Sequence, residues 1–332
     1  MQAPFFIVGN DRSGTTMLRL VLDRGPSVAI PPESMFLADF APVRRAGGLG
    51  DPERARRLLE RVWRHPKVRL WGLPGGPPPV PTGLSHAEAY RYVVEAPFRA
   101  YALAHGKPRF ADKTPPYLHM VDELLEVWPE ARVVVLVRDG RDVALSIRRL
   151  PFGPNNVWAA AHWWARGIRV GLRAQEAHPG QVLTIRYEDV AADPQASVAR
   201  ICEFVGMAFD PDMLAIERAD RSKIVADQAG WFPGLWRQID AAGVGRWRTA
   251  MSPHDQRLFA TIAGPELAAF GYSGGEANGA RPTPARRRLY ELHNEALRNV
   301  NFVRLRIVHE RGRELRYALG RKVARTRGRG YL

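Results

Sequence analysis

Cysteine, acidic residues and long apolar runs are scarce in this chain of 332 residues. Cys202 is the only cysteine, which excludes an intramolecular disulfide, and we expect it to be a buried helical residue. No apolar run is long enough to span a bilayer. An apolar strand pattern already begins at Phe5, so we expect neither a signal peptide nor a membrane anchor before it. The sequence therefore predicts a cytoplasmic protein, and it leaves a peripheral membrane association open.

The shortage of acidic residues is concentrated at the C-terminal end. The chain has 49 Lys and Arg against 34 Asp and Glu, a formal net charge of +15. Residues 281–332 hold fifteen basic and four acidic residues, so this tail carries about +11 of that charge. Its apolar residues recur at steps of three and four, which predicts an amphipathic helix. Such a tail could pack on the body, lie on an anionic membrane or bind an acidic partner. The predicted apolar stripe consists of Leu289, Leu292, Ala296, Val300, Val303 and Ile307.

The stretch from Pro4 to Leu22 predicts an anion-binding loop. The apolar strand Phe5–Val8 leads into the polar loop Gly9–Gly14, and a helical pattern follows. This arrangement directs backbone N–H groups and a helix dipole at an anion, and its glycines allow a close approach. The predicted contacts are Arg12, Ser13, Gly14, Thr15 and Thr16.

The loop nearly matches the nucleotide P-loop pattern, Gly-x-x-x-x-Gly-Lys-Ser/Thr. Thr15 stands where that pattern has its lysine, so the loop is poorly suited to a triphosphate with Mg²⁺. A P-loop kinase or NTPase remains an alternative, as does an ordinary turn between a strand and a helix.

A second strand–turn–helix pattern runs from Ala131 to Ser146. Its continuous Val/Leu run predicts a strand covered on both faces, as in a parallel sheet. Arg138 ends that strand, where ligands gather in such sheets, and Ser146 follows about two helical turns later. The two side chains predict a second phosphate site. A simple pair between Arg138 and Asp142 at the sheet edge is the structural alternative.

Together the two motifs resemble sulfotransferases that use 3′-phosphoadenosine-5′-phosphosulfate (PAPS). The resemblance runs from about Phe5 to Tyr272, is patchy between Phe40 and Arg109, and is stronger to the tyrosylprotein and bacterial branch than to the cytosolic aryl branch. It implies an α/β fold, P-loop-like, with three layers and a central parallel sheet. It also implies transfer of a sulfuryl group from PAPS to a hydroxyl, with PAP as product and no metal. Further matching segments are Pro32-Glu33-Ser34, Asp112-Lys113-Thr114-Pro115, Ile185-Arg186-Tyr187-Glu188-Asp189 and Val244-Gly245-Arg246-Trp247-Arg248.

The resemblance also implies the catalytic roles. Glu33 would be the general base, and Arg12 and Lys113 would neutralise charge on the transferring group and the leaving phosphate. A solvated loop carboxylate is the alternative for Glu33, and a surface pair with Asp112 is the alternative for Lys113. His162 is the rival base.

The cofactor contacts implied by the resemblance come from both motifs and from later segments. The first loop would bind the 5′-phosphosulfate, and Arg138 and Ser146 would bind the 3′-phosphate. Tyr187 would contact the adenine, and Ser222 would contact a phosphate. Arg246 belongs to a late basic loop that would close over the cofactor, and it stands where the family often has a lysine, so its partner on the cofactor is open.

The acceptor is open: carbohydrate, lipid and small-metabolite hydroxyls all remain, and the expected lack of a membrane anchor puts a protein-tyrosine acceptor in doubt. Two aromatic groups could stack on an acceptor or belong to the core; they are Trp158, Trp163 and Trp164, and Trp231, Phe232 and Trp236.

We expect residues 1–275 to form the sulfotransferase domain and residues 281–332 to form a basic, amphipathic helical extension. The variable segment at about 40–110 would shape the acceptor side. A protein that keeps the fold but only binds nucleic acid or a membrane through its tail is the remaining alternative.

Overall fold

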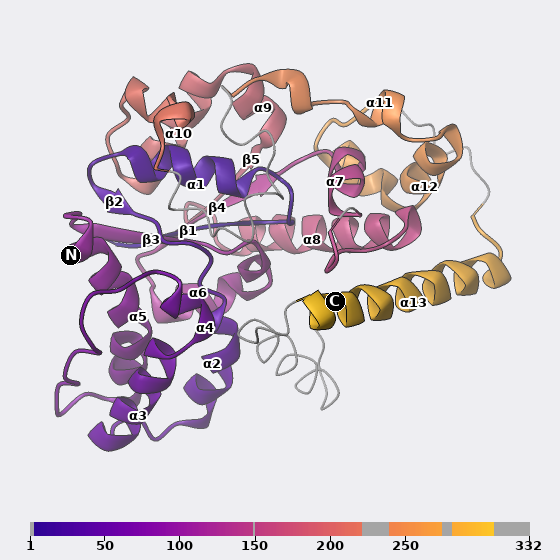
Figure 1. Ribbon diagram of the computed structural model, residues 1–332. Coiled ribbons are helices and arrows are strands. Elements are labelled where there is room, and N and C mark those ends of the chain that lie inside the picture. Colours follow the sequence, from indigo (N-terminus) through magenta and orange to yellow (C-terminus); the bar gives the residue numbers. More distant parts are fainter. Residues whose placement is uncertain (1–2, 149, 221–238, 274–280, 309–332) are drawn as a thin grey trace.

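A five-stranded sheet forms the centre of the computed structural model, which describes residues 3–148, 150–220, 239–273 and 281–308 (Figure 1). The strand order is β2-β3-β1-β4-β5, and every neighbouring pair is parallel. This confirms the predicted α/β fold with a central parallel sheet. The strands are β1 (Phe5–Gly9), β2 (Val28–Ala29), β3 (Arg109–Lys113), β4 (Arg132–Val137) and β5 (Val182–Arg186).

The sheet separates two hydrophobic cores because successive side chains of a strand point to opposite faces. In β1, Phe5 and Ile7 belong to one core, whereas Phe6 and Val8 belong to the other. The smaller core is closed by α1 (Thr15–Arg24), α9 (Tyr187–Ala192) and α10 (Pro194–Val205), on the upper side in Figure 1. Cys202 is buried in α10, as predicted.

The larger core includes the segment expected to vary, residues 40–110. Its helices are α2 (Phe36–Ala46), α3 (Pro52–Trp63), the single-turn α4 (Pro66–Arg69) and α5 (His86–Ala104). The same face is covered by α6 (Val121–Val127), α7 (Gly140–Ile147), α8 (Val157–Ala177) and α12 (Pro253–Ala269).

Capping residues fix several of these boundaries. Ser85 and Glu88 form a reciprocal capping box at the start of α5, and Asp51 caps α3 directly before Pro52. Between β3 and β4 the chain forms a 3₁₀ helix, η1 (Pro115–Met120), followed by α6. The break lies at Met120, whose φ of −132° and ψ of 20° are not helical.

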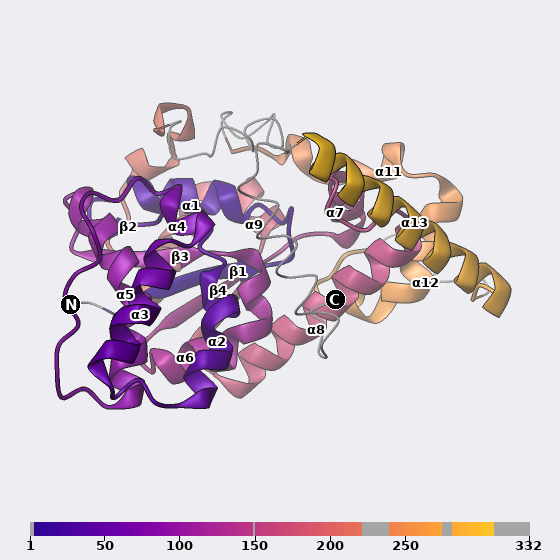
Figure 2. The ribbon, with the colours of Figure 1, turned by 60° about the horizontal axis from the view of Figure 1, so that its bottom comes forward.

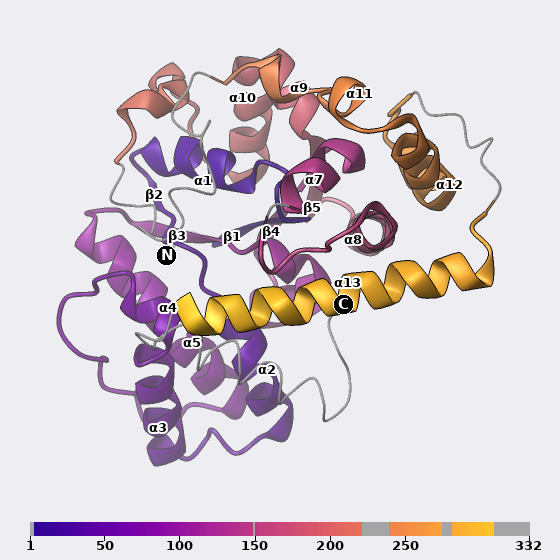
Figure 3. The same ribbon diagram turned by 45° about the vertical axis from the view of Figure 1, so that its right-hand side comes forward.

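The described part of the predicted extension contains one helix, α13 (Pro284–Val308). It lies beside α8 at the periphery of the molecule (Figures 2 and 3). Asn155, at the start of α8, donates its backbone N–H to the Asn294 side chain at 2.8 Å, and the Trp158 and Tyr290 rings stack at 5.8 Å. In the part of the chain that the structure describes, no helix is both long and apolar enough to cross a bilayer.

Candidate active site

The loop between β1 and α1 has a backbone that requires its glycines. Gly9 and Gly14 adopt φ values of +151° and +96°. A Cβ atom on Gly9 would lie 2.4 Å from the Leu136 carbonyl oxygen, and one on Gly14 would lie 2.6 Å from the Tyr187 ring. Arg12 also has a positive φ, +71°, which is unusual for a residue with a side chain. The strain and the close contacts fit a loop shaped to bring backbone N–H groups to an anion.

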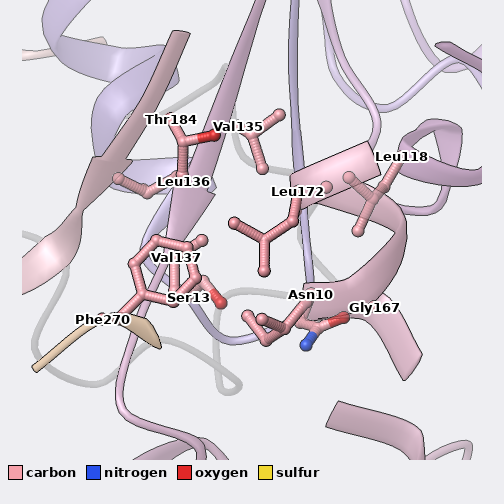
Figure 4. A pocket seen from close by; sticks show the side chains of 13 residues that line it. Asn10, Ser13, Leu118, Val135, Leu136, Val137, Gly167, Leu172, Thr184 and Phe270 are labelled. Atoms are coloured by element: carbon pink, nitrogen blue, oxygen red, sulfur yellow. The ribbon is translucent and has the colours of Figure 1, made fainter. Parts of the chain in front are cut away.

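Asn10 anchors this loop to α8. Its side-chain amide donates to the Trp164 carbonyl at 3.0 Å, and its Oδ1 occupies the space where Gly167 lacks a side chain. Behind the loop, a small pocket lies between the sheet and α8 (Figure 4). The Ser13 hydroxyl is fully buried and lines that pocket, whereas the Thr16 hydroxyl accepts a hydrogen bond from Lys113 at 3.3 Å. Thr15 is buried in the first turn of α1.

Arg12, Arg138 and Ser146, predicted from two separate motifs, form one cluster. Arg12 Nε donates to Ser146 Oγ at 2.9 Å, and Arg138 Nη1 donates to the Arg12 carbonyl at 3.4 Å. The Arg138 guanidinium lies 4.3 Å from the centre of the Tyr187 ring. Among the described residues Arg138 forms no salt bridge, and its Nε has no hydrogen-bond partner.

The electrostatics of this cluster suit an anion. Burial lowers the pKa of Arg12, and the nearby Arg138 charge lowers it further against the opposing effects of Asp11 and Glu33. Two guanidinium groups held this close repel each other, and an anion between them relieves that repulsion. Tyr187, the expected adenine contact, lies between the Gly14 backbone and Arg138.

Glu33 and Lys113 form an ion pair beside the loop. Lys113 Nζ lies 2.5 Å from Glu33 Oε1, and the Lys113 residue is only 3% exposed. The alternative of a surface pair between Lys113 and Asp112 is wrong, because Asp112 is fully buried and burial raises its pKa to about 7. Burial also raises the pKa of Glu33, but Lys113, with Lys67 and Arg19, more than offsets this and holds that pKa below its usual value. Glu33 is therefore a carboxylate with 27% of its side chain exposed.

The segment that leads from β2 to Glu33 is held in place by two residues of α1. Asp23 Oδ1 accepts the Ile30 backbone N–H at 2.8 Å, and Arg19 donates to the Ile30 carbonyl at 3.2 Å. Pro31 and Pro32 follow and restrict the backbone before Glu33.

Hydroxyl groups hold the other side of Glu33. The Ser34 backbone N–H donates to Thr114 Oγ1 at 3.0 Å, and Ser34 Oγ lies 2.8 Å from Tyr117 Oη. Tyr117 Oη in turn accepts the Leu37 backbone N–H at 2.9 Å. The backbone that follows Glu33 is thus tied to the start of η1 by buried hydrogen bonds.

The segment before α11 (Trp247–Ala250) lies next to the Arg138 cluster. Arg138 Nη2 donates to the Gly243 carbonyl at 2.6 Å, and Arg246 is exposed three residues later. The expected alternative pair of Arg138 with Asp142 is absent among the described salt bridges, because Asp142 accepts backbone N–H groups of Gly245 and Trp247.

His162, the rival base, lies elsewhere. It is exposed, its ring packs edge-on against Trp158 at 4.5 Å, and its charged neighbours Arg287 and Glu291 belong to α13. Trp164 is fully buried, whereas Trp158 and Trp163 are partly buried against the larger core. Four further predicted residues lie outside the described ranges: Ser222, Trp231, Phe232 and Trp236.

Some residues of the site could not be recognised from the sequence. Asp142, Ser34, Thr114 and Tyr117 contribute through hydrogen bonds between distant segments. Ser34 and Thr114 lie inside recognised segments and Asp142 was considered only as a partner of Arg138, but nothing in the sequence showed which groups these residues would bind. Within the described ranges, no three His, Cys, Asp or Glu side chains are placed to hold a metal ion.

A glycine loop, a buried cation–carboxylate pair and an arginine cluster thus meet at the carboxyl edge of a parallel sheet. Comparison with known proteins shows the family to which the chain belongs. The sequence profile of the sulfotransferase family matches residues 4–211, and that of the sulfotransferase domain matches residues 158–271. The chain belongs to the sulfotransferase family. This sulfotransferase is a PAPS-dependent enzyme of class EC 2.8.2.-, so the kinase, NTPase and non-catalytic alternatives are not supported.

Relatives of this sulfotransferase are distant. It is 24% identical over 275 residues to a putative protein-tyrosine sulfotransferase of Caenorhabditis briggsae, covering 80% of this chain and 88% of that protein. It is 23% identical over 291 residues to the nodulation protein NoeE of Sinorhizobium fredii, covering 79% of this chain and 64% of that protein.

Solved structures share its fold. The sulfotransferase domain of the Synechococcus PCC 7002 olefin synthase superimposes with a TM-score of 0.56 at 24% identity, covering 82% of this chain and 97% of that domain. A sulfotransferase domain from the curacin biosynthetic pathway gives a TM-score of 0.54 at 19% identity, covering 82% and 99%.

Proposed function

We propose that Glu33 is the general base of this sulfotransferase. The observation that carries the proposal is the Glu33–Lys113 pair, which lies beside the loop and is electrostatically coupled to Arg12. Glu33 takes the proton of the acceptor hydroxyl while the acceptor oxygen forms its bond to sulfur. The bond between sulfur and the 5′-phosphate oxygen breaks at the same time, and PAP leaves with that oxygen.

Cationic side chains neutralise the charge that develops on the leaving phosphate. Lys113 contacts Thr16 of the loop and Glu33, and a lysine ammonium has three N–H donors. Its third donor serves the oxygen that bridges sulfur and phosphate, and Arg12 stabilises the transferring group. In this proposal the side chains supply the stabilisation without a metal.

Arg138 and Ser146 bind the 3′-phosphate of PAPS in this proposal. The unpartnered Nε of Arg138 and its closeness to Arg12 support a preformed site for a dianion. Tyr187 and Arg246 add contacts to the nucleotide, and the same role is proposed for Ser222.

Calorimetric titration with PAP tests this assignment. Arg138→Ala removes a charge-assisted contact worth about 1.5–3 kcal/mol, so PAP affinity should fall about ten- to a hundredfold. Arg173→Ala, which removes an exposed arginine of α8, is the matched control and should leave the affinity unchanged. Adenosine-5′-phosphosulfate lacks the 3′-phosphate and should bind poorly to the wild type. Equal affinity for both compounds would refute the site.

The acceptor is a hydroxyl compound of the carbohydrate, lipid or small-metabolite class. In this proposal the segment at about 40–110 shapes the acceptor side, because Lys67 of that segment is near enough to Glu33 to help lower the pKa of its carboxyl. Transfer from radiolabelled PAPS to fractionated cell extracts identifies the class. Label that appears only in protein would exclude all three classes.

We further propose that residues 281–332 form a separate extension that docks on an anionic membrane, making the enzyme a cytoplasmic, peripheral one. Five of the eight large apolar side chains that are exposed in the described part of the chain lie on α13. They are Leu289, Leu292, Leu297, Val300 and Val303, which are 65%, 48%, 37%, 45% and 49% exposed.

The way α13 packs leaves Leu289, Leu292, Val300 and Val303 outward, whereas Leu297 shares the side of Asn294 and Asn301. Tyr290, Asn294 and Asn301 contact the start of α8 from another side of the helix. Glu291 and Glu295 are paired with Arg288 and Arg298. Because α13 contains further arginines and no further acidic residue, the helix carries an excess of basic charge. An apolar stripe flanked by arginines complements anionic lipid, whereas two copies of this helix would repel each other.

A further inference from the structure

Asp142 bridges the two residues that flank Arg246. Its Oδ2 accepts the Gly245 backbone N–H at 2.7 Å, and its Oδ1 accepts the Trp247 backbone N–H at 2.9 Å. Asp142 is 4% exposed and lies in the first turn of α7; its bond from Trp247 is buried and its bond from Gly245 is partly buried. Arg246, between the two amides, is exposed and does not contribute a backbone bond to this carboxylate.

The bridged loop adopts a conformation that needs such support. Gly245 has a φ of +72°, and the chain turns tightly on either side, with Val244 N–H bonded to Ala241 and Arg248 N–H bonded to the Gly245 carbonyl at 3.0 Å. Two hydrogen bonds from one helix residue hold the amides on either side of Arg246, and this fixes both the position and the direction of the Arg246 Cα–Cβ bond.

Neighbours of Asp142 hold the same loop. Arg141 is fully buried, pairs with Asp139 at 2.7 Å and stacks on the Trp247 ring with its guanidinium carbon 3.5 Å from the ring centre. Arg138 donates to the Gly243 carbonyl. Residues 138–142 therefore both contribute the 3′-phosphate arginine and hold the loop that carries Arg246.

The loop lies against the cofactor cluster. A Cβ atom on Gly243 would be 3.3 Å from both the Arg138 guanidinium and the Tyr187 hydroxyl. Arg246, three residues further on, is thereby kept on the side of the molecule where these two residues lie.

We propose that Asp142 is a positioning residue for PAPS binding: it holds Gly245 and Trp247 so that Arg246 faces the nucleotide. The inference rests on the proposed cofactor role of Arg246 and deepens it. Asp142 itself touches no substrate; it acts through the loop.

A double-mutant cycle with PAP titration tests the proposal. Asp142→Asn keeps the size of the side chain but replaces one acceptor oxygen by an NH₂ group, which cannot accept the second backbone N–H. We expect Asp142→Asn to weaken PAP binding about tenfold when Arg246 is present, and by less than about twofold in an Arg246→Ala background, because coupled residues are not additive. Asp193→Asn, in which a carboxylate that caps α10 is replaced, is the matched control and should not change the affinity.

Hydrogen exchange gives a second readout that does not depend on activity. The amides of Gly245 and Trp247 should exchange faster in Asp142→Asn than in the wild type, while amides of β1 keep their protection. Equal weakening of PAP binding in both Arg246 backgrounds, or unchanged exchange of the two amides, would overturn the positioning role. If Arg246→Ala alone leaves PAP affinity unchanged, the inference also fails, whereas the PAPS site itself still stands on the Arg138 result.

Discussion

Lys113 Nζ and Glu33 Oε1 lie 2.5 Å apart, and this pair joins the end of β3 to the exit of β2. Burial raises the pKa of the Glu33 carboxyl, but the Lys113 ammonium outweighs this effect, lowers the pKa and keeps Glu33 ionised. A carboxylate paired in this way is a weak base. On the proposed mechanism the third donor of Lys113 serves the leaving phosphate oxygen, and the negative charge that develops there weakens the hold of the ammonium on Glu33, so the carboxylate becomes more basic as it takes the acceptor proton.

Replacing Glu33 by Gln should lower kcat about 10²- to 10⁴-fold, the usual contribution of a general base. The amide keeps the shape of the side chain but cannot take a proton from the acceptor. PAP affinity should hardly change, because Glu33 is assigned to the acceptor. Steady-state transfer and PAP titration measure the two quantities.

His162→Ala is the comparison variant for Glu33→Gln and should keep most of the activity, since His162 packs on Trp158 next to α13. An inactive His162 variant together with an active Glu33 variant would move the catalytic role to the histidine.

The pH profile should report the lowered pKa of Glu33. The base acts only when deprotonated, so kcat/KM should be maintained above the pKa and be lost as pH falls through it, with the midpoint below 4.5. Lys67→Met removes one of the cations that lower this pKa, so the acidic limb should move to higher pH. Assays at low pH are kept brief, and the activity is measured again after return to neutral pH. Full recovery of activity distinguishes titration of Glu33 from irreversible unfolding. An acidic limb that stays in place in the variant would contradict the assignment.

Truncation after residue 280 should abolish salt-sensitive binding to vesicles that contain phosphatidylserine. The extension carries about +11 of the net charge of +15, and α13 exposes its apolar stripe. Transfer to a small soluble acceptor should persist. Leu292→Gln, a point variant with the tail charge unchanged, should weaken vesicle binding without affecting the transfer rate.

Three other results would speak against membrane docking. Unchanged vesicle binding by the truncated chain would refute it directly. Self-association of the intact chain that is lost on truncation would indicate a second copy on this face, and loss of folding would show that the stripe completes the core.

Gly167→Ala should weaken PAP binding and destabilise the fold. A Cβ atom there would lie 1.8 Å from Asn10 Oδ1, so Asn10 must move and its bond to the Trp164 carbonyl is lost. Overpacking of this kind costs about 1–3 kcal/mol of unfolding free energy, measurable by urea denaturation. Gly264→Ala is the matched control, because no atom lies within 4 Å of its Cβ position. Equal stability of the two variants would show that Asn10 does not anchor the loop.

Much of the fold was predictable because its signals are local. The apolar runs of β1 and β4, the glycines at 9 and 14, and the caps at Asp51 and Ser85 each act within a few residues. The order of the two motifs along the chain then indicated a parallel sheet with a phosphate-binding edge, and the structure confirms that sheet.

Contacts between distant segments were decided only by the tertiary structure. Arg12 and Ser146 are 134 residues apart, and their hydrogen bond merges two predicted anion sites into one cluster. Lys113 was assigned a possible surface partner in the adjacent Asp112, but alternation along β3 directs these neighbours to opposite faces, and Lys113 pairs with Glu33 instead.

The sequence by itself determined the strand–loop–helix units, the basic extension and the residue types of the site, because these follow from periodicity, glycine positions and charge. It could not determine which carboxylate meets which cation or amide. Asp142 looked like a salt-bridge partner of Arg138, yet it accepts two backbone N–H groups from residues more than 100 positions away. Backbone groups carry no sequence signal, so the pairing depends on how the late loop packs on α7 in three dimensions.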